Sequence, residues 1–177
     1  RTWNERIIYL SMSGCGTDGP WSNYVTYAPT IHALSGITYL TNPEGRHDVG
    51  CGISMSDHVS GLAGALAMLE ALAARDRSGV GQRIDLSQLE VGVGMTGPAI
   101  LDYLANGRLA EPVGNRDAFE DFVPCGVFPC RGGQWLAVTA RSDEEWQRLT
   151  ETIGATDLAA DRTLATLAGR RASRARI

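Results

Sequence analysis

One carboxylate in the segment MSDHVSGLAGALAML, residues 55–69, stands where a reactive group could be held. Asp57 lies between a stretch that contains Gly50 and Gly52 and a long apolar run, at the expected start of a helix. Aspartate is a favoured helix cap, so a structural role is the simpler interpretation. The same helix end stabilises a negative charge, and an ionised carboxylate can act as a nucleophile. Spacing alone leaves both roles open.

A second candidate for chemistry is the glycine-rich segment GCGTDGPW, residues 14–21, which follows an expected strand. Loops of this kind can cradle phosphates. This one matches neither G-x-G-x-x-G nor the P-loop pattern, because it continues as G-C-G-T-D-G and then meets Pro20. We therefore expect a substrate-lining loop, in which Gly14 and Gly16 contact the substrate, and we expect the same of Gly52.

Other groups that often carry chemistry are scattered. No pairing of His32, His47 or His58 with Asp or Cys predicts a triad, and His58 should point about 100° away from Asp57 around a helix. The four cysteines have neither C-x-x-C spacing nor a histidine at zinc-ligand spacing: Cys15, Cys51, Cys125 and Cys130. We expect no metal site, and free, buried thiols that fit a reducing cytoplasm.

Alternating strands and helices are expected to position the first group of candidates. The segments 6–14 and 82–87 have the composition of strands. A short helix is expected over 28–36, and apolar residues at intervals of three and four predict a long one from Ser56 to Gly79. A further helix over 89–106 should be kinked or split by Pro98, which lacks the backbone donor that a helix interior needs.

The second part of the chain has a different pattern. Residues 125–140 predict a hairpin turning around Gly132 and Gly133, and residues 142–154 predict a helix with Ser142 as N-cap and Glu145 at the capping-box position. Further helices are expected beyond it. The fold class is therefore α/β with a parallel sheet, followed by a smaller α+β part. The expected boundaries are 1–107, a linker over 108–123, and 124–177.

Bulk composition excludes some partners. The 177 residues are 44% hydrophobic and 20% charged, with a net charge of −4. There is therefore no electrostatic case for a nucleic acid or an anionic membrane as a partner. The most apolar run, 59–74, is too short to span a bilayer. The chain opens on RTWNERIIYL, without an initiator Met, and stops at GRRASRARI, so we expect an internal piece of a longer cytoplasmic protein.

Taken in order, several blocks resemble the family III CoA-transferases, also called the CaiB/BaiF family. The blocks are IIYLSMSGCGTDGP, YAPTIHALSGITYLT, MSDHVSGLAGALAMLEALAARDRSGVGQRIDLSQLE, PVGNR and VFPCRGGQWLAVTARSDEEW, and they span almost the whole chain. The more specific ones are S-x-S-G-x-G-x-x-G-P, the SDHVSGL helix start and R-x-x-G-x-G-Q-x-I-D-x-S. Each alone is modest evidence, whereas all of them in order identify the family.

The resemblance implies a reaction and an assembly. Such enzymes move CoA from an acyl-CoA thioester to a carboxylic acid, and their nucleophile is the aspartate at the position of Asp57. The implied intermediates are an aspartyl mixed anhydride and an aspartyl-CoA thioester. CoA is then a substrate, and no permanently bound cofactor is expected. The resemblance also implies a Rossmann-like large domain, a small domain and an interlocked homodimer.

A related class, the α-methylacyl-CoA racemases, is the alternative. In those enzymes the aspartate is an acid/base, and its partner is a histidine in a G-H-D block ahead of an A-L-S-G-like segment. Counted back from Gly36, that position holds Tyr27, so the second base is missing. A tyrosine there is typical of the transferases, and we expect Tyr27 to line the active site.

The sequence departs from the transferase pattern in two places. Residues 114–124 read GNRDAFEDFVP where some members have a run of glycines, and Ala28 follows Tyr27 where some have an acid. No loop residue and no helper carboxylate is therefore assigned. The family's N-terminal segment and its C-terminal return are also absent from these residues. A third alternative is thus a non-catalytic acyl-CoA-binding subunit or fragment.

Overall fold

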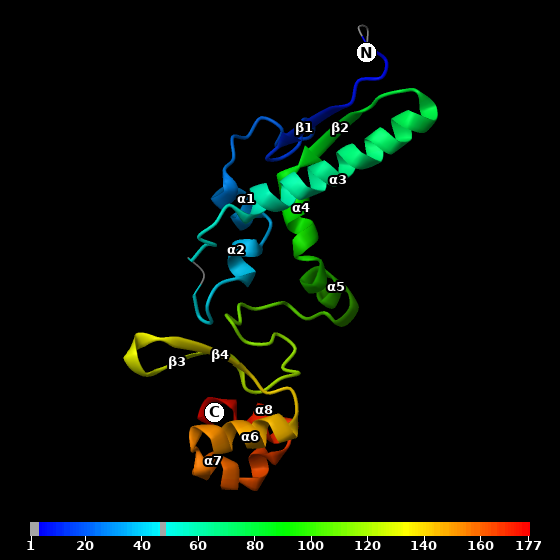
Figure 1. The fold of residues 1–177 in the computed structure, drawn as a ribbon. Helices are drawn as coiled ribbons and strands as arrows, with labels where there is room; N and C mark the ends of the chain where they lie inside the picture. Colours follow the sequence, from blue (N-terminus) through cyan, green and yellow to red (C-terminus); the bar gives the residue numbers. More distant parts are fainter. Residues whose placement is uncertain (1–3, 47–48) are drawn as a thin grey trace. The chain divides into compact units, whose positions relative to one another are not determined.

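The computed structural model describes residues 4–46 and 49–177, so His47 lies outside the described residues. The chain divides into two compact units, unit 1 from Arg1 to Pro112 and unit 2 from Val113 to Ile177 (Figure 1). Among the described residues, each unit contains one two-stranded sheet. The sheet of unit 1 is parallel and that of unit 2 is antiparallel.

The sheet of unit 1 joins strands that are far apart in the sequence. Strand β1, Tyr9–Ser13, pairs in parallel with β2, Arg83–Ser87, in a register that places Tyr9 opposite Arg83 and Ser13 opposite Ser87. Both strands lie within the predicted segments, and their parallel pairing was predicted from the strand–helix–strand alternation. Parallel strands need a crossover connection, which here contains three helices.

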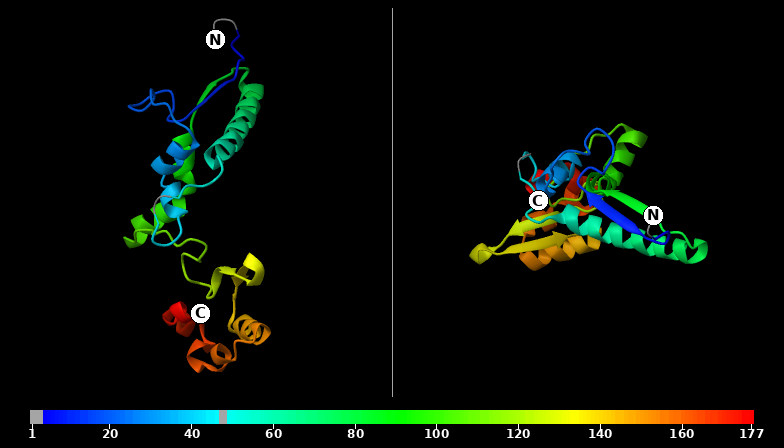
Figure 2. Two further views of the ribbon diagram at one scale, coloured as in Figure 1. Left: turned by 90° about the vertical axis from the view of Figure 1, so that its left-hand side faces the viewer. Right: turned by 90° about the horizontal axis from the view of Figure 1, so that it is seen from above.

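The longest element of that crossover is α3, Met55–Ser78, which lies alongside the β1–β2 pair in both Figure 1 and Figure 2. It matches the predicted helix within one residue at each end. It ends at Gly79, whose φ of 75° lies in the left-handed region that glycine adopts at little cost. The backbone N–H of Gly79 donates to the carbonyl of Arg75 and closes the last turn.

The buried face of α3 consists of small residues: Ser56, Ser60, Gly64 and Ala71. At Gly64 a Cβ would stand 3.1 Å from the Leu10 side chain, so the helix approaches β1 closely there. The leucines that give the helix its apolar period lie on another face. Leu62, Leu66 and Leu69 are 72%, 59% and 63% exposed. Close packing on the strands therefore selects small side chains and leaves a row of leucines on the surface of unit 1.

The predicted helix over 89–106 is split, as Pro98 predicted. Helix α4 covers Gln88–Met95 and α5 covers Gly97–Asn106, with Thr96 ending one and preceding the other. The Oγ of Ser87 accepts a hydrogen bond from the N–H of Glu90, at 3.3 Å, and so caps α4 directly after β2. The chain thus passes from strand to helix at Ser87 without an intervening loop.

Two short helices precede α3. Helix α1, Ala28–Leu34, ends before the predicted limit at Gly36, and α2, Ile37–Leu40, was not predicted. Gly36, with φ of 83°, joins them. The fully buried Asn42 then donates to the Thr38 carbonyl and accepts from the Val49 N–H. This side chain anchors the segment that leads to α3.

Unit 2 begins with the predicted hairpin. Strand β3, Cys125–Pro129, pairs with β4, Trp135–Thr139, around a 3₁₀ turn, η1, at Arg131–Gly133. Helix α6, Asp143–Ile153, follows, and Ser142 Oγ caps it by accepting from the Glu145 N–H at 3.2 Å. The capping box differs from its usual form in one bond. Glu145 Oε2 accepts from the N–H of Arg141, at 2.8 Å, one residue before the cap.

The rest of unit 2 closes a small core. The elements are α7 at Thr156–Ala160, η2 at Arg162–Ala165, α8 at Leu167–Ala172 and η3 at Arg174–Arg176. Ala140, Trp146 and Leu164 form the buried centre. Arg170, 1% exposed, lies beside it with its guanidinium 5.6 Å from the Trp146 ring. It donates to the carbonyls of Val123 and Leu164 and pairs with Asp143 at 2.8 Å.

Two expectations about the surface have different outcomes. All four cysteines are free, as predicted, but the expectation that they are buried is wrong. Cys15, Cys51 and Cys125 are half-buried and Cys130 is exposed, because they lie in loops or at strand ends and not on packed faces. Within residues 4–46 and 49–177, none of the helices is long and apolar enough to cross a bilayer.

Candidate active site

Asp57 stands in the first turn of α3, three residues after the N-cap residue Ser54. Its backbone N–H donates to the Ser54 carbonyl at 3.1 Å. Its carboxylate does not bond to the helix amides. Instead Oδ1 accepts a hydrogen bond from Nε2 of Gln88, at 2.7 Å. The exposed side chain therefore has one oxygen fixed by α4 and a second oxygen, Oδ2, with no hydrogen bond from any described residue.

The end of β2 and the start of α4 also contact the glycines of the loop at residues 14–21. The N–H of Leu89, next to Gln88, donates to the carbonyl of Gly14 at 2.9 Å. A Cβ on Gly14 would lie only 1.7 Å from Oγ1 of Thr26, so Thr26 would have to shift to admit any larger residue. Gly16, with φ of 83°, would place a Cβ 3.7 Å from that of Ser87. Asp57 and Gly14 thus hydrogen-bond to Gln88 and Leu89, and Gly16 lies close to Ser87.

Tyr27 and Gly52 are placed differently. Tyr27 is the N-cap residue of α1, and its side chain is 75% exposed. Gly52 lies ahead of α3 with no heavy atom within 4 Å of where its Cβ would stand. The structure therefore leaves space around both predicted residues but shows no hydrogen bond that ties either to the Asp57 carboxylate.

Two histidines form hydrogen bonds at the start of α3, one from α1 and one from α3 itself. The buried His32, on α1, accepts a hydrogen bond at Nε2 from the backbone N–H of Ser56, at 3.1 Å. The exposed His58 places Nδ1 2.8 Å from the Ser54 carbonyl, so this nitrogen carries a proton and donates it. Among the described residues, neither histidine hydrogen-bonds to a carboxylate or thiol.

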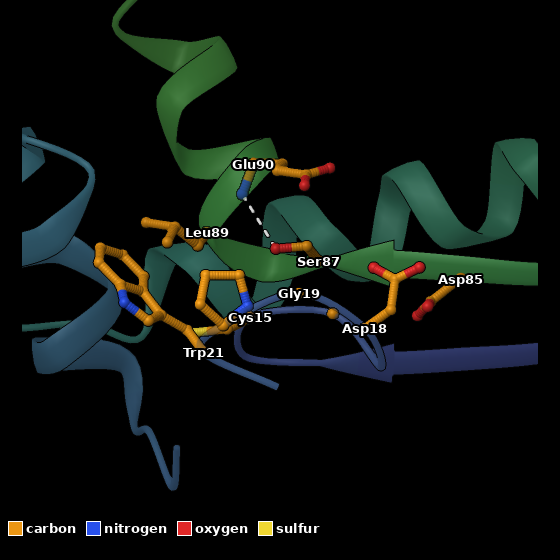
Figure 3. A pocket seen from close by; sticks show the side chains of 10 residues that line it. Cys15, Asp18, Gly19, Trp21, Asp85, Ser87, Leu89 and Glu90 are labelled. Atoms are coloured by element: carbon orange, nitrogen blue, oxygen red, sulfur yellow. Dashed lines mark hydrogen bonds between the residues drawn. The ribbon is translucent and has the colours of Figure 1, made fainter. Parts of the chain in front are cut away.

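The predicted substrate-lining loop borders a cleft of about 530 Å³ (Figure 3). The other wall comes from the end of β2 and the start of α4. The lining residues are Cys15, Gly16, Asp18, Gly19, Pro20, Trp21, Asp85, Ser87, Leu89 and Glu90. Figure 3 shows Trp21 towards one end and the Asp18 and Asp85 carboxylates towards the other. Gly16 is the single predicted site residue in this lining.

The charge of this cleft is negative. Asp18, Asp85 and Glu90 contribute carboxylates. The hydrogen bond from Thr17 Oγ1 is the main cause that lowers the pKa of Asp85, and Arg83 lowers this pKa further. Asp85 is therefore anionic at neutral pH.

Two residues of the site were missed by reasoning from the sequence. Gln88 carried no signal of its own, because it lies between a predicted strand and a predicted helix. Gln88 is 31 residues from Asp57 in the sequence, so nothing local predicts their contact. The contact arises because β1 pairs in parallel with β2 and α3 packs on them. His32 was noted but had no partner in the sequence, because its partner is a backbone amide.

The chain matches CoA-transferase family III over residues 1–177. The chain belongs to this family. A probable CoA-transferase of Mycobacterium tuberculosis is 34% identical over 167 residues, which are 90% of this chain and 20% of that protein. The succinyl-CoA–D-citramalate CoA-transferase of Chloroflexus aurantiacus is 30% identical over 163 residues, 92% of this chain and 40% of that protein. The resemblance identified from the sequence is confirmed.

A solved structure gives the same relationship for the fold. A CaiB/BaiF family protein from Brucella suis superposes with a TM-score of 0.90 at 28% identity, covering 99% of this chain and 46% of that one. The family III chain described here therefore spans less than half the length of each of these three relatives. Within residues 4–46 and 49–177, no cluster of three or more His, Cys, Asp or Glu side chains is placed to hold a metal ion.

Proposed function

We propose that this chain supplies the nucleophile for transfer of CoA from an acyl-CoA thioester to a carboxylic acid, and that this nucleophile is Asp57. The observation that carries the proposal is the state of its carboxylate. In a family III chain, Oδ1 is held by Gln88 while Oδ2 is exposed and has no partner among the described residues. A carboxylate that is fixed at one oxygen and accessible at the other is suited to covalent catalysis.

The reaction proceeds in four acyl-substitution steps. Oδ2 of Asp57 attacks the thioester carbonyl, a C–O bond forms, the C–S bond breaks, and CoA leaves as thiolate. The thiolate attacks the aspartyl carbonyl of the mixed anhydride, which yields aspartyl-CoA and releases the donor acid as carboxylate. The acceptor carboxylate then displaces CoA from Asp57, and the thiolate attacks the acceptor's carbonyl carbon. The products are the new acyl-CoA and free Asp57, with no net proton transfer.

The start of α3 supports these steps electrostatically. The positive end of the helix dipole stabilises negative charge near it. The Gln88 amide limits rotation of the carboxylate, so that Oδ2 meets the thioester in a defined orientation. We assign substrate or CoA contacts to Gly14, Gly16 and Gly52 and to the exposed Tyr27. Tyr27 replaces the histidine that racemase chemistry would need.

The names of two relatives support a chemical class of substrate for this chain. One is named an acetyl-CoA:oxalate CoA-transferase, from Acetobacter aceti, and another acts between succinyl-CoA and D-citramalate. Their shared feature is an acyl-CoA donor and a carboxylate acceptor, and we propose that class for this chain. We also propose a Rossmann-like large domain over 1–107, a linker over 108–123, a small domain over 124–177, an interlocked homodimer and a cytoplasmic location.

Trapping tests the proposal. We expect that incubation with acyl-CoA, followed by hydroxylamine or borohydride, modifies Asp57, and peptide mass spectrometry locates the change. Asp57→Asn should remain unmodified, while Asp76→Asn, on the same helix, should be labelled normally at Asp57. An unmodified Asp57 in folded, natural-length protein would contradict the proposal. Exchange of the substrate α-proton with deuterated water should be absent, and its presence would favour the racemase alternative.

A further inference from the structure

The first turn of α3 receives a hydrogen bond from a different helix. The N–H of Ser56 donates to Nε2 of His32, at 3.1 Å, and the His32 side chain on α1 is almost fully buried. Amides of a first helical turn have no partner within the helix, and the cap residue usually accepts from one of them. Ser54, the N-cap residue, makes no such side-chain bond. His32 takes its place.

The bond defines the state of the His32 ring. A backbone N–H can only donate, so Nε2 must accept and carries no proton. The ring proton of the neutral imidazole is then on Nδ1. An imidazolium has no acceptor nitrogen, so only the neutral ring can satisfy the Ser56 amide. Ser56 is 1% exposed, and water cannot readily replace the histidine there.

We infer that His32 is a positioning residue, which holds through Ser56 the helical turn on which Asp57 stands. Asp57 directly follows Ser56, so a shift of that turn moves the carboxylate. Gln88 holds the same residue by its side chain, from α4. The backbone and the side chain of the turn are therefore fixed by two different helices. The inference rests on the proposed function of Asp57.

Helix α1 extends the consequence to a second site residue. Tyr27 is its N-cap residue and His32 lies in its last turn. Because α1 has only seven residues, the bond between His32 and Ser56 fixes the start of α3 relative to the backbone of Tyr27. Losing the bond should disturb the spacing between the two residues assigned to the reaction, not only the stability of α3.

Two substitutions of His32 in the natural-length protein test whether its hydrogen-bond acceptor, and not merely the volume of its side chain, is needed. His32→Leu leaves the Ser56 amide without a partner, whereas His32→Gln offers Oε1 as an acceptor. We expect His32→Leu to slow single-turnover labelling of Asp57 by tenfold to about a hundredfold, because a displacement near 1 Å has effects of that order. His32→Gln should keep most of the rate. The Kd for CoA, measured by calorimetry, should change little in either variant.

Leu164→Ala, in the core of unit 2, serves as the stability control. It should lower the melting temperature but leave the rate of Asp57 labelling unchanged. A His32→Leu protein that loses no more rate than Leu164→Ala at equal folded fraction would overturn the positioning role. So would a His32→Gln protein that is as slow as His32→Leu.

Amide exchange measured by NMR separates this inference from the proposed function. The Ser56 N–H should be protected in the wild type and in His32→Gln, and should exchange faster in His32→Leu. This readout does not depend on the chemistry of Asp57. A protected Ser56 amide without labelling of Asp57 would contradict the proposed function, whereas an unprotected one in the wild type would contradict the His32 bond.

Discussion

In unit 1 the longest helix buries serine, glycine and alanine, whereas in unit 2 the helix α6 buries a tryptophan against a leucine and an arginine. The buried residues of α3 are small, and three of its leucines are more than half exposed. In unit 2, Trp146 and Leu164 are 4% and 0% exposed. Helix α6 therefore packs through large side chains, while α3 packs through small ones that allow a close approach.

The difference shows where each unit is sensitive. A core of large side chains is weakened when volume is removed, because a cavity remains. A close contact between backbones is weakened when volume is added, because the elements must separate. The site residues Gly14 and Asp57 lie in unit 1, where Gly14 and Gly64 make close approaches of this kind. Its geometry should thus be more easily lost by enlarging a glycine than by trimming a leucine.

The largest expected effect is on the core of unit 2. Leu164→Ala should lower the free energy of unfolding by roughly 2–5 kcal/mol, because the fully buried side chain leaves a cavity. Leu66→Ala, on the exposed row of α3, should change it by less than about 0.5 kcal/mol. Urea denaturation of both variants measures the contrast. Equal losses would contradict it and show that the α3 leucines are buried in the protein under study.

A smaller effect is expected from enlarging a glycine in unit 1. Gly14→Ala should destabilise by about 1–3 kcal/mol, because the new Cβ would overlap the side chain of Thr26. Gly52→Ala is the matched control, with open space around its Cβ, and should stay within about 0.5 kcal/mol. Thermal denaturation compares the two. If Gly14→Ala is as stable as Gly52→Ala, the approach of Gly14 to Thr26 is looser than described.

The smallest effect concerns acid. Hydrogen bonds from Thr163, with help from Arg176, lower the pKa of Asp161 in unit 2, as Thr17 lowers that of Asp85 in unit 1. A lowered pKa stabilises the fold above the unfolded value, near 3.8, and the stabilisation disappears as the pH falls through the folded value. Asp161→Asn and Asp85→Asn should each flatten the loss of melting temperature below about pH 4.

Removing the donor alone checks the stated cause of this acid dependence. Thr163→Val keeps the shape of the side chain but lacks the hydroxyl that bonds to Asp161. It should reproduce part of the Asp161→Asn effect. An unaltered acid profile in Thr163→Val would mean that Thr163 Oγ1 is not the main stabilising partner of the ionised Asp161.

Much of the fold could be predicted because its signals are local. The α3 helix was predicted from its apolar period and Gly79, the break between α4 and α5 from Pro98, and the start of α6 from Ser142. The same apolar period said nothing about which face is buried. That choice depends on β1 lying against Gly64, a contact between segments far apart in the chain.

The site was predictable to a lesser extent. Asp57 could be selected because its neighbours match a family pattern, and no rule of spacing alone distinguished it from a helix cap. Gln88 and His32 could not be selected, because each acts through a hydrogen bond to α3 that the fold creates. One is an amide donor that follows a strand, and the other is a ring nitrogen that replaces a cap.

The two sheets also differ in when they can form. Cys125 pairs with Thr139 across a short turn, whereas Tyr9 pairs with Arg83 only after the whole of α3 has been made. Closing a long loop costs more chain entropy, and parallel, non-local pairing slows folding. On a ribosome, β1 therefore waits without its partner until β2 emerges. During that interval the edge of β1 that pairs with β2 is unpaired, and an unpaired strand edge favours association with other chains.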